Sequence, residues 1–200
     1  MKLYFTPGAC SLVPHILLEE LGLAFELEQV DLKTKTTKSG ADFSAINSKG
    51  YVPALVLDNG HVLTEVSVLA QYLSDLKPEA GLIPAAGEAR YQLLSLLVYI
   101  STEIHKPMGS LFNPNASDDA RAAAQTLLTR RLNWIAAELA GKPYLTGDSY
   151  TAADAYLFTV LGWARLVNFD LSPWPTLQAL CGKVAERPAV QRAMKAEGLI

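Results

Sequence analysis

Apolar and polar residues recur in distinct patterns along the first third of the chain. Residues 2–6 (KLYFT) form a short apolar and aromatic run that is typical of a β-strand. Residues 11–21 (SLVPHILLEEL) have a helical pattern, in which Pro14 is tolerated because it lies in the first turn, and Gly22 follows as a C-cap. Residues 25–32 (FELEQVDL) alternate apolar and polar positions, which predicts a second strand and hence a βαβ unit.

A hairpin and another helix follow this unit. Residues 33–50 are polar and rich in Lys, Thr and Gly, so we expect a loop with at most one short helix. Two apolar runs, residues 54–57 (ALVL) and 61–63 (HVL), flank residues 58–60 (DNG). Asn-Gly between strands favours a type I′ turn, because that turn needs positive φ at both central residues. Residues 65–76 are again helical, which gives the order β-α-β-α-β-β-α.

The rest of the chain shows only helical patterns. Residues 77–88 (KPEAGLIPAAGE) hold two prolines and two glycines, which is typical of a linker. Beyond it, helices are predicted at about 88–111, 117–140, 152–166 and 175–196. Proline is expected to break them at Pro107, Pro114, Pro143, Pro173 and Pro188. Thr151 and Asp154 are spaced as a capping box at the start of the third helix, whose apolar run indicates a buried core.

These elements predict an α+β protein in two domains. Residues 1–77 would form a thioredoxin-like domain with a mixed four-stranded sheet and helices. Residues 78–87 would form the linker, and residues 88–200 an all-helical bundle domain.

Composition narrows the classes of partner. Half of the 200 residues are apolar, and 17 basic residues face 20 acidic ones, which argues against nucleic acid or an anionic membrane as a partner. The N-terminus does not resemble a signal peptide, and no apolar stretch reaches the 18 residues of a membrane span. Only Cys10 and Cys181 are present, without a metal-binding spacing, so we expect no metal and a reducing cytoplasmic location.

Cys10 is the first candidate for chemistry. It follows a Pro-Gly-Ala turn and opens the first helix, where unpaired N–H groups and the helix dipole favour an anion. That position biases a thiol toward the thiolate. An inert cysteine that fills a helix start is an equal alternative on position alone. Cys181 lies inside an amphipathic helix, where we expect it only to pack.

Two further positions suit a ligand with peptide and amino-acid character. Val52-Pro53 precedes a strand, and a cis bond there would let the Val52 backbone pair with an extended peptide-like ligand, although only about one X–Pro bond in twenty is cis. Thr64-Glu65 opens the next helix, where N–H groups can hold a carboxylate and Glu65 an ammonium. Taken alone, Glu65 is better explained as ordinary compensation of the helix dipole. His105 lies on a predicted helix and can donate to a thiolate, or simply pack.

The order of these features closely resembles the bacterial cysteine-type (beta-class) glutathione transferases. The segments that carry the resemblance are MKLYFTPGACSLVPHILLEELGL, KGYVPALVLDNGHVLTE, TEIHK, TAADAYLFTVLGWA and AERPAVQRAMKAEGL, and together they extend over the whole chain. The resemblance implies the fold predicted above, a homodimer, and glutathione as co-substrate.

It also implies roles for single positions. Cys10 matches the cysteine that contacts glutathione. Val52, before a cis proline at Pro53, matches the residue whose backbone pairs with the cysteinyl unit. Glu65, with the backbone of Val66, matches the clamp on the γ-glutamyl unit.

The resemblance also assigns roles to four other residues. Lys35 matches a basic residue near the glycyl carboxylate, and His105 a helical histidine near the sulfur. Thr102 and Glu103 match residues that reach the partner subunit's site.

The chain also departs from the family pattern at three positions. Val66 stands where Gly or Ser is usual, Val98 where Asn typically faces the site, and Leu96 where Trp is typical. We expect these changes to lower catalytic efficiency or glutathione affinity without affecting the fold.

The resemblance therefore predicts a detoxifying transferase that joins the glutathione sulfur to small hydrophobic electrophiles, with Cys10 and His105 as catalytic residues. The electrophile would lie in a cleft lined by the helix at 88–111. Two alternatives remain. Cys10 can instead support monothiol exchange with glutathione, which needs no CxxC partner. The chain can also be a non-catalytic binding protein that keeps only the fold, for which Val66 and Val98 are the support.

Overall fold

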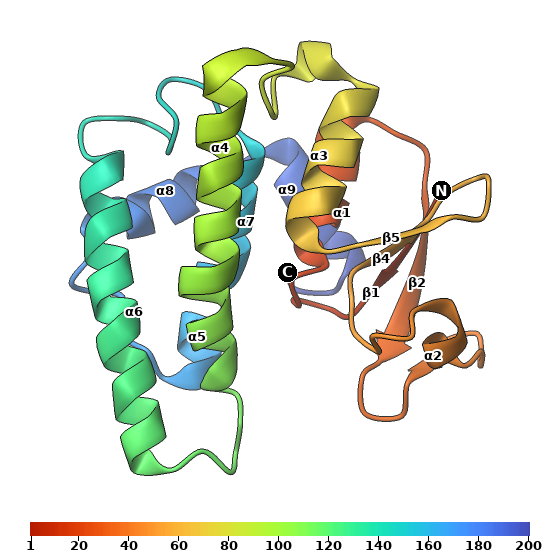
Figure 1. Ribbon diagram of the computed structural model, residues 1–200, viewed down its shortest axis with the longest axis horizontal. Helices are drawn as coiled ribbons and strands as arrows, with labels where there is room; N and C mark the ends of the chain where they lie inside the picture. The colour runs from red at the N-terminus through yellow and green to blue at the C-terminus, as the bar shows by residue number, and fades with distance from the viewer. The chain divides into compact units, whose positions relative to one another are not determined.

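The computed structural model describes residues 1–200 (Figure 1). Contacts along the chain define two compact units, one of residues 1–83 together with 187–200, and one of residues 84–186. The first unit holds the only sheet, and the second is helical, which confirms the predicted α+β fold.

The sheet has the strand order β3-β2-β1-β4-β5. Strand β1 (Lys2–Phe5) pairs in parallel with β2 (Glu26–Asp31) and antiparallel with β4 (Ala54–Val56). Strand β5 (Val62–Thr64) pairs antiparallel with β4, as the predicted hairpin requires. The sheet has five strands instead of the expected four, because a two-residue strand β3 (Thr36–Thr37) pairs with the end of β2.

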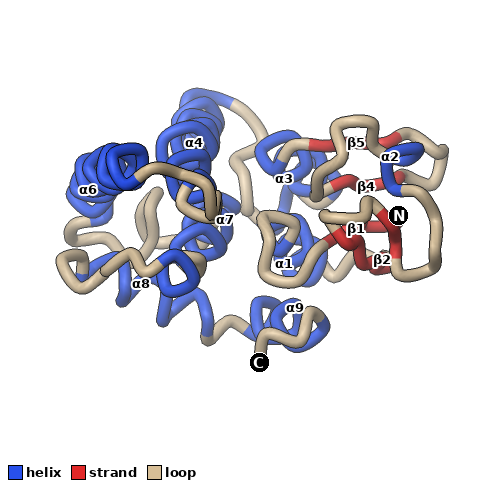
Figure 2. The backbone as a smooth tube through the Cα atoms, turned by 90° about the horizontal axis from the view of Figure 1, so that it is seen from below, coloured by secondary structure: helices blue, strands red, loops and turns tan.

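Helices cover both faces of this sheet. Helix α1 (Leu12–Leu21) packs against α3 (Val66–Leu76) and α9 (Pro188–Ala196), and the three lie together beside the strands in Figure 2. Alternate residues of a strand point to opposite faces. Phe5 accordingly lies near His15 of α1, with ring centroids 6.2 Å apart. On the opposite face, Tyr4 packs on Phe43 of the short helix α2 (Phe43–Ile46), with ring centroids 5.6 Å apart.

The turn of the hairpin differs from the expected type. Gly60 has φ 84°, but Asn59 is not in the left-handed region, so the type I′ turn was wrong. The Gly60 N–H donates to the Leu57 carbonyl at 2.9 Å, and the Leu57 N–H donates to the His61 carbonyl at 2.8 Å. One glycine in the left-handed region at the end of the loop is typical of the longer hairpin loop with a bulge.

The C-terminal segment packs with the first unit. Arg187 binds Glu20 of α1 through two nitrogens, at 2.6 and 2.9 Å, and Arg192 binds Glu19 at 2.5 Å. Residues 187–200 therefore do not join the helical unit to which the sequence-based boundaries assigned them. The chain breaks between α8 (Pro175–Ala185) and α9, just before Pro188, as the sequence predicted.

Glu197 completes this packing from beyond the end of α9. Its carboxylate lies 2.8 Å from His15 Nδ1 and accepts the Gly8 N–H, also at 2.8 Å. The side chains of Glu197 and His15 are both fully buried. A carboxylate can only accept here, so His15 Nδ1 carries the hydrogen.

The helical unit begins with a nearly continuous helix. Helix α4 (Gly87–Tyr99) runs through a π-helical segment, Ile100–His105, into α5 (Lys106–Ser110). Pro107 was expected to break this helix but lies in the first turn of α5. Proline lacks an N–H and its ring crowds the carbonyl four residues before it. The wider π-helical turn before Pro107 gives room for that carbonyl, so the helix continues.

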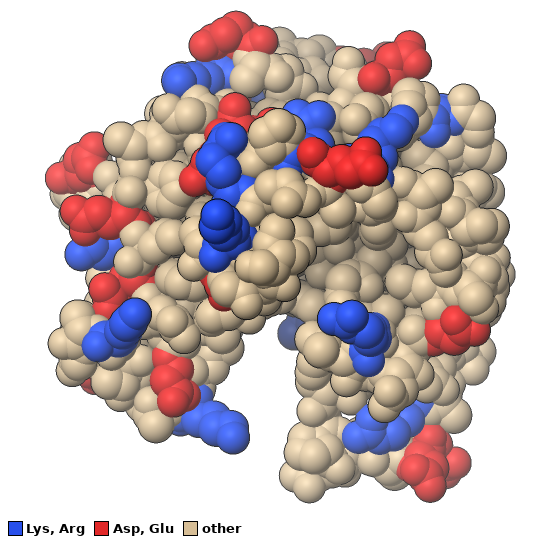
Figure 3. Space-filling model, turned by 180° about the vertical axis from the view of Figure 1, so that it is seen from behind, with Lys and Arg blue, Asp and Glu red and all other residues tan.

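Helices α6 (Asp118–Leu139), α7 (Ala152–Leu161) and α8 form the rest of the helical unit. The predicted capping box between Thr151 and Asp154 is present at the start of α7, which is buried along nearly its whole length. None of the helices is both long enough and apolar enough to cross a membrane. On the face drawn in Figure 3, acidic and basic side chains are interspersed.

Candidate functional site

Cys10 lies in the loop that joins β1 to α1. Gly8 has φ 70°, which favours glycine in this loop. The Ala9 N–H donates to the Thr6 carbonyl at 3.0 Å, and the Thr6 N–H donates to the buried Ser11 hydroxyl at 3.2 Å. These bonds fix the loop, and α1 begins only at Leu12, two residues after Cys10.

The thiol of Cys10 lies against the segment that precedes β4. Cys10 Sγ is 3.3 Å from the carbonyl oxygen of Val52, and the Val52–Pro53 peptide bond is cis, as the resemblance implied. The Val52 N–H donates to no other backbone group. The structure therefore brings a thiol beside a backbone N–H and C=O that can pair with a peptide.

The ionisation state of Cys10 differs from the expected one. Burial raises the pKa of the Cys10 thiol to about 12, and the nearby Glu65 carboxylate raises it further. The backbone N–H groups of Cys10 and Ser11 act in the opposite direction, but burial dominates. The expectation of a thiolate at a helix start was therefore wrong. Cys10 is a neutral thiol at pH 7 that can donate to the Val52 carbonyl.

Cys181 has a similarly raised pKa of about 12, caused by its burial in α8. The two cysteines therefore differ in their surroundings rather than in acidity. Only Cys10 lies beside the Val52 backbone carbonyl and near the Glu65 carboxylate.

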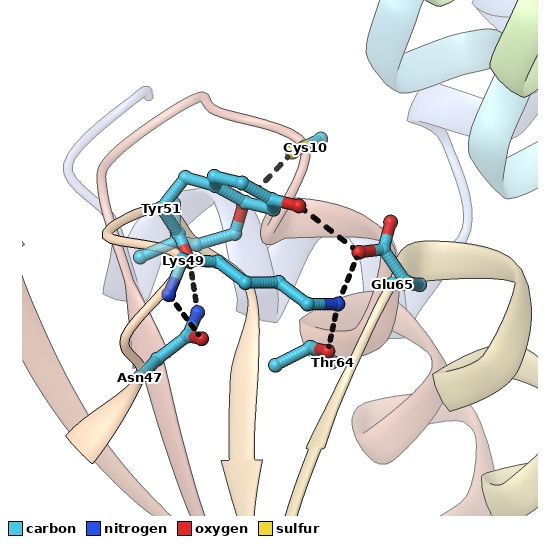
Figure 4. A network of polar contacts seen from close by, with 7 residues as sticks. Cys10, Asn47, Lys49, Tyr51, Thr64 and Glu65 are labelled. Carbon is cyan, nitrogen blue, oxygen red and sulfur yellow. Dashed lines mark hydrogen bonds and ion pairs between the residues drawn. The ribbon is translucent and has the colours of Figure 1, made fainter.

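Glu65 precedes α3 in an uncommon backbone conformation. Its φ of 71° is unusual for a residue with a side chain, and such strain collects at functional sites. Its side chain makes no capping bond to α3, so simple capping does not explain it. Instead, Glu65 Oε1 accepts from Lys49 Nζ at 2.7 Å and from the Tyr51 hydroxyl at 3.1 Å (Figure 4). Val66 begins α3, and its side chain is buried.

Lys35 reaches the same segment from the loop before β3. Its Nζ donates to the Gly50 carbonyl at 2.5 Å. Gly50 has φ 69°, and a Cβ placed there would lie 3.5 Å from Lys35 Cε. Residues 49–53 thus have Lys35, Cys10 and Glu65 as neighbours, and they are the common centre of the site.

The remaining predicted residues lie in the helical unit. Thr102, Glu103 and His105 all fall in the π-helical segment. Thr102 donates to the Val98 carbonyl at 3.1 Å, and Glu103 pairs with Arg131 at 2.6 Å. Their roles toward glutathione stay predictions.

His105 is fixed by aromatic neighbours. Its Nδ1 is 2.8 Å from the Tyr156 hydroxyl, and its ring meets Trp163 edge-on with centroids 4.9 Å apart. These contacts hold the imidazole in one orientation. Val98, one turn before Thr102, is 55% exposed.

Sequence reasoning missed Lys49 and Tyr51. Lys49 lies in a turn and Gly50, which separates it from Tyr51, has φ 69°. No regular strand or helix spacing relates the two residues, and nothing in the sequence identified Glu65 as their partner.

Comparison with known proteins identifies the family. Residues 8–76 match the family model "Glutathione S-transferase, N-terminal domain", and residues 118–196 match "Glutathione S-transferase, C-terminal domain". The chain is 42% identical to the glutathione S-transferase GstA of Escherichia coli O157:H7, over the full length of both proteins.

Two solved structures are similar over their whole length. The bacterial beta-class glutathione S-transferase of Sphingomonas chungbukensis is 45% identical, with a TM-score of 0.95 and complete coverage of both chains. A sphingomonad glutathione S-transferase complexed with glutathione is 46% identical, with the same TM-score and coverage. The chain therefore belongs to the glutathione S-transferase family. The resemblance to its bacterial beta class is confirmed.

Proposed function

We propose that this protein joins the sulfur of glutathione to small hydrophobic electrophiles. One observation carries the proposal: Cys10 lies beside the Val52 backbone, with Glu65 and Lys35 contacting the same segment from either side. Glutathione is a tripeptide with an ammonium at one end, a cysteinyl peptide unit in the middle and a carboxylate at the other end. Glu65, the Val52 backbone and Lys35 offer a partner for each in that order.

The neutral Cys10 thiol suits transfer better than thiol exchange. Exchange needs a thiolate as the attacking group, whereas a thiol with a pKa of about 12 is almost entirely protonated at pH 7. A neutral S–H can instead donate to the sulfur of bound glutathione. This observation favours the transferase over the monothiol alternative.

The reaction requires glutathione to lose its thiol proton, which passes to solvent. Its sulfur then forms a bond to a carbon of the electrophile, whose leaving group departs. A free thiol has a pKa near about 8.5, and lowering it by about two units requires roughly 3 kcal/mol. Two hydrogen bonds to the charged sulfur, of about 1.5 kcal/mol each, supply that. We assign these bonds to Cys10 and His105.

The rest of the assignment extends the same proposal. We propose a homodimer, in which Thr102 and Glu103 reach the partner subunit's site, because α4 presents exposed apolar side chains at Tyr91 and Val98. A detoxifying role in the cytoplasm completes the proposal. The two free cysteines support a reducing compartment.

Titration calorimetry with glutathione, followed by an assay with a generic aryl halide, tests the function. We expect one glutathione bound per chain and formation of the conjugate. A protein that binds glutathione without forming conjugate would support the non-catalytic alternative. A protein that does neither would refute the proposal.

A further inference from the structure

The carboxylate of Glu65 already has a cationic partner from this chain. Lys49 Nζ lies 2.7 Å from Glu65 Oε1 and donates to the Thr64 hydroxyl at 2.9 Å. Figure 4 shows the Lys49 side chain extended along the site, with its ammonium between these two oxygens. The Tyr51 hydroxyl donates to the same Glu65 oxygen at 3.1 Å.

This arrangement is an ammonium-binding site occupied by an ammonium. A primary ammonium has three N–H donors, and the Glu65 carboxylate and the Thr64 hydroxyl oxygen can each accept one of them. The α-ammonium of a γ-glutamyl unit has the same charge and the same three donors as Lys49 Nζ. The two ammonium groups would therefore compete for the same Glu65 oxygen.

The ion pair between Lys49 and Glu65 is also easily broken. The side chains of Lys49 and Glu65 are 45% and 52% exposed, and exposed ion pairs are weak. The lysine stem is long and flexible, so its ammonium can move into water when another cation arrives. The hydrogen bond to Glu65 raises the pKa of Lys49, which keeps the competing group charged.

We infer that Lys49 is a displaceable occupant of the ammonium site and lowers the affinity of the protein for glutathione. The inference rests on the proposed function, because it concerns the same site. Glutathione binding exchanges one ammonium for another at Glu65, and the released Lys49 returns to solvent. Lys49 thereby sets the concentration of glutathione at which the site fills.

A general electrostatic effect predicts the opposite result. Glutathione carries two carboxylates and one ammonium at pH 7, so removing any nearby lysine charge should weaken its binding. A lysine that only orients Glu65 would also weaken binding when removed. Competition alone predicts that Lys49→Met binds glutathione more tightly.

The test is calorimetric titration of the full chain with glutathione under reducing conditions. We expect Lys49→Met to lower the Kd about 2–5-fold, the range of a typical exposed ion pair. Lys38→Met is the matched control, because Lys38 is exposed and contacts neither Glu65 nor Thr64. It should leave the Kd unchanged or raise it. Unchanged thermal midpoints would show that both variants fold.

A second ligand isolates the ammonium. The deaminated tripeptide, with a glutaryl group in place of the γ-glutamyl unit, has no cation to compete with Lys49. Lys49→Met should therefore not tighten its binding. If Lys49→Met tightens binding of both ligands equally, or fails to tighten binding of glutathione, the inference is overturned. If the wild-type protein binds no glutathione, the proposed function itself fails.

Discussion

Replacing Glu197 by Gln removes a carboxylate that the buried His15 and the part-buried Gly8 N–H share. One oxygen lies 2.8 Å from His15 Nδ1, and the other accepts the Gly8 N–H at 2.8 Å. An amide has only one accepting oxygen, so the variant leaves one of these donors facing an NH₂ group. His15 Nε2 has no hydrogen-bond partner, and the buried ring packs edge-on against Phe25 with centroids 5.5 Å apart.

The expected cost follows from burial. Leaving a buried donor without its acceptor typically costs about 1–3 kcal/mol, and more where the lost acceptor carries a charge. We take about 3 kcal/mol, because one of the two donors loses a carboxylate oxygen as its acceptor. In a chain of this length, each kcal/mol shifts the thermal midpoint by about 2–4 °C, so Glu197→Gln should lower it by about 6–12 °C.

Thermal unfolding followed by circular dichroism at pH 7 measures this shift. Glu186→Gln is the control, because Glu186 is exposed and forms no ion pair in the structure. It should change the midpoint by no more than about 2 °C. Equal shifts in the two variants would show that the buried contacts of Glu197 do not hold the first unit together.

Three other predictions concern the site. Glu65→Gln should weaken glutathione binding about tenfold or more, by the loss of a charge-assisted bond, with a small change in thermal midpoint. A collapse of the midpoint at unchanged affinity would make Glu65 purely structural. Alkylation of Cys10 in the free protein should accelerate about tenfold per pH unit up to pH 10, because its pKa of about 12 keeps the thiolate scarce throughout that range. A plateau near pH 8 would contradict the raised pKa. Val98→Asn should raise catalytic efficiency up to about tenfold by restoring one neutral hydrogen bond. No gain in an active enzyme would mean that residue 98 does not face glutathione.

The fold was largely predictable because its elements have strong local patterns. The βαβ unit, the hairpin, the capping box of α7 and the break before Pro188 all follow from residues close in sequence. Strand β3 was missed because two threonines make no alternating pattern. The hairpin turn was assigned wrongly because Asn-Gly is compatible with two loop lengths, and only the backbone shows that Gly60 alone has positive φ.

The site was predictable only in part. Resemblance identified Cys10, Val52 and Glu65, and the structure brings their surroundings together. The predicted charge on Cys10 was wrong because a helix dipole acts on groups in the first turn, whereas the half-buried thiol lies before that turn and desolvation raises its pKa.

Partnerships between distant residues were not predictable at all. Lys49 and Tyr51 are long polar side chains whose partner is chosen by the tertiary fold. His15 and Glu197 are separated by 182 positions, and no local pattern connects them.

The packing of α9 on α1 has a consequence for how this protein is made. A ribosome synthesises residues 1–83 first, but the unit they belong to needs residues 187–200, which emerge only after the whole helical unit. Domains usually fold in order as they emerge. Here Arg187, Arg192 and Glu197 are synthesised after the helical unit, so the Gly8 N–H and His15 gain their partner only then. Residues 1–83 are therefore synthesised before the helical unit but can complete their packing only after it.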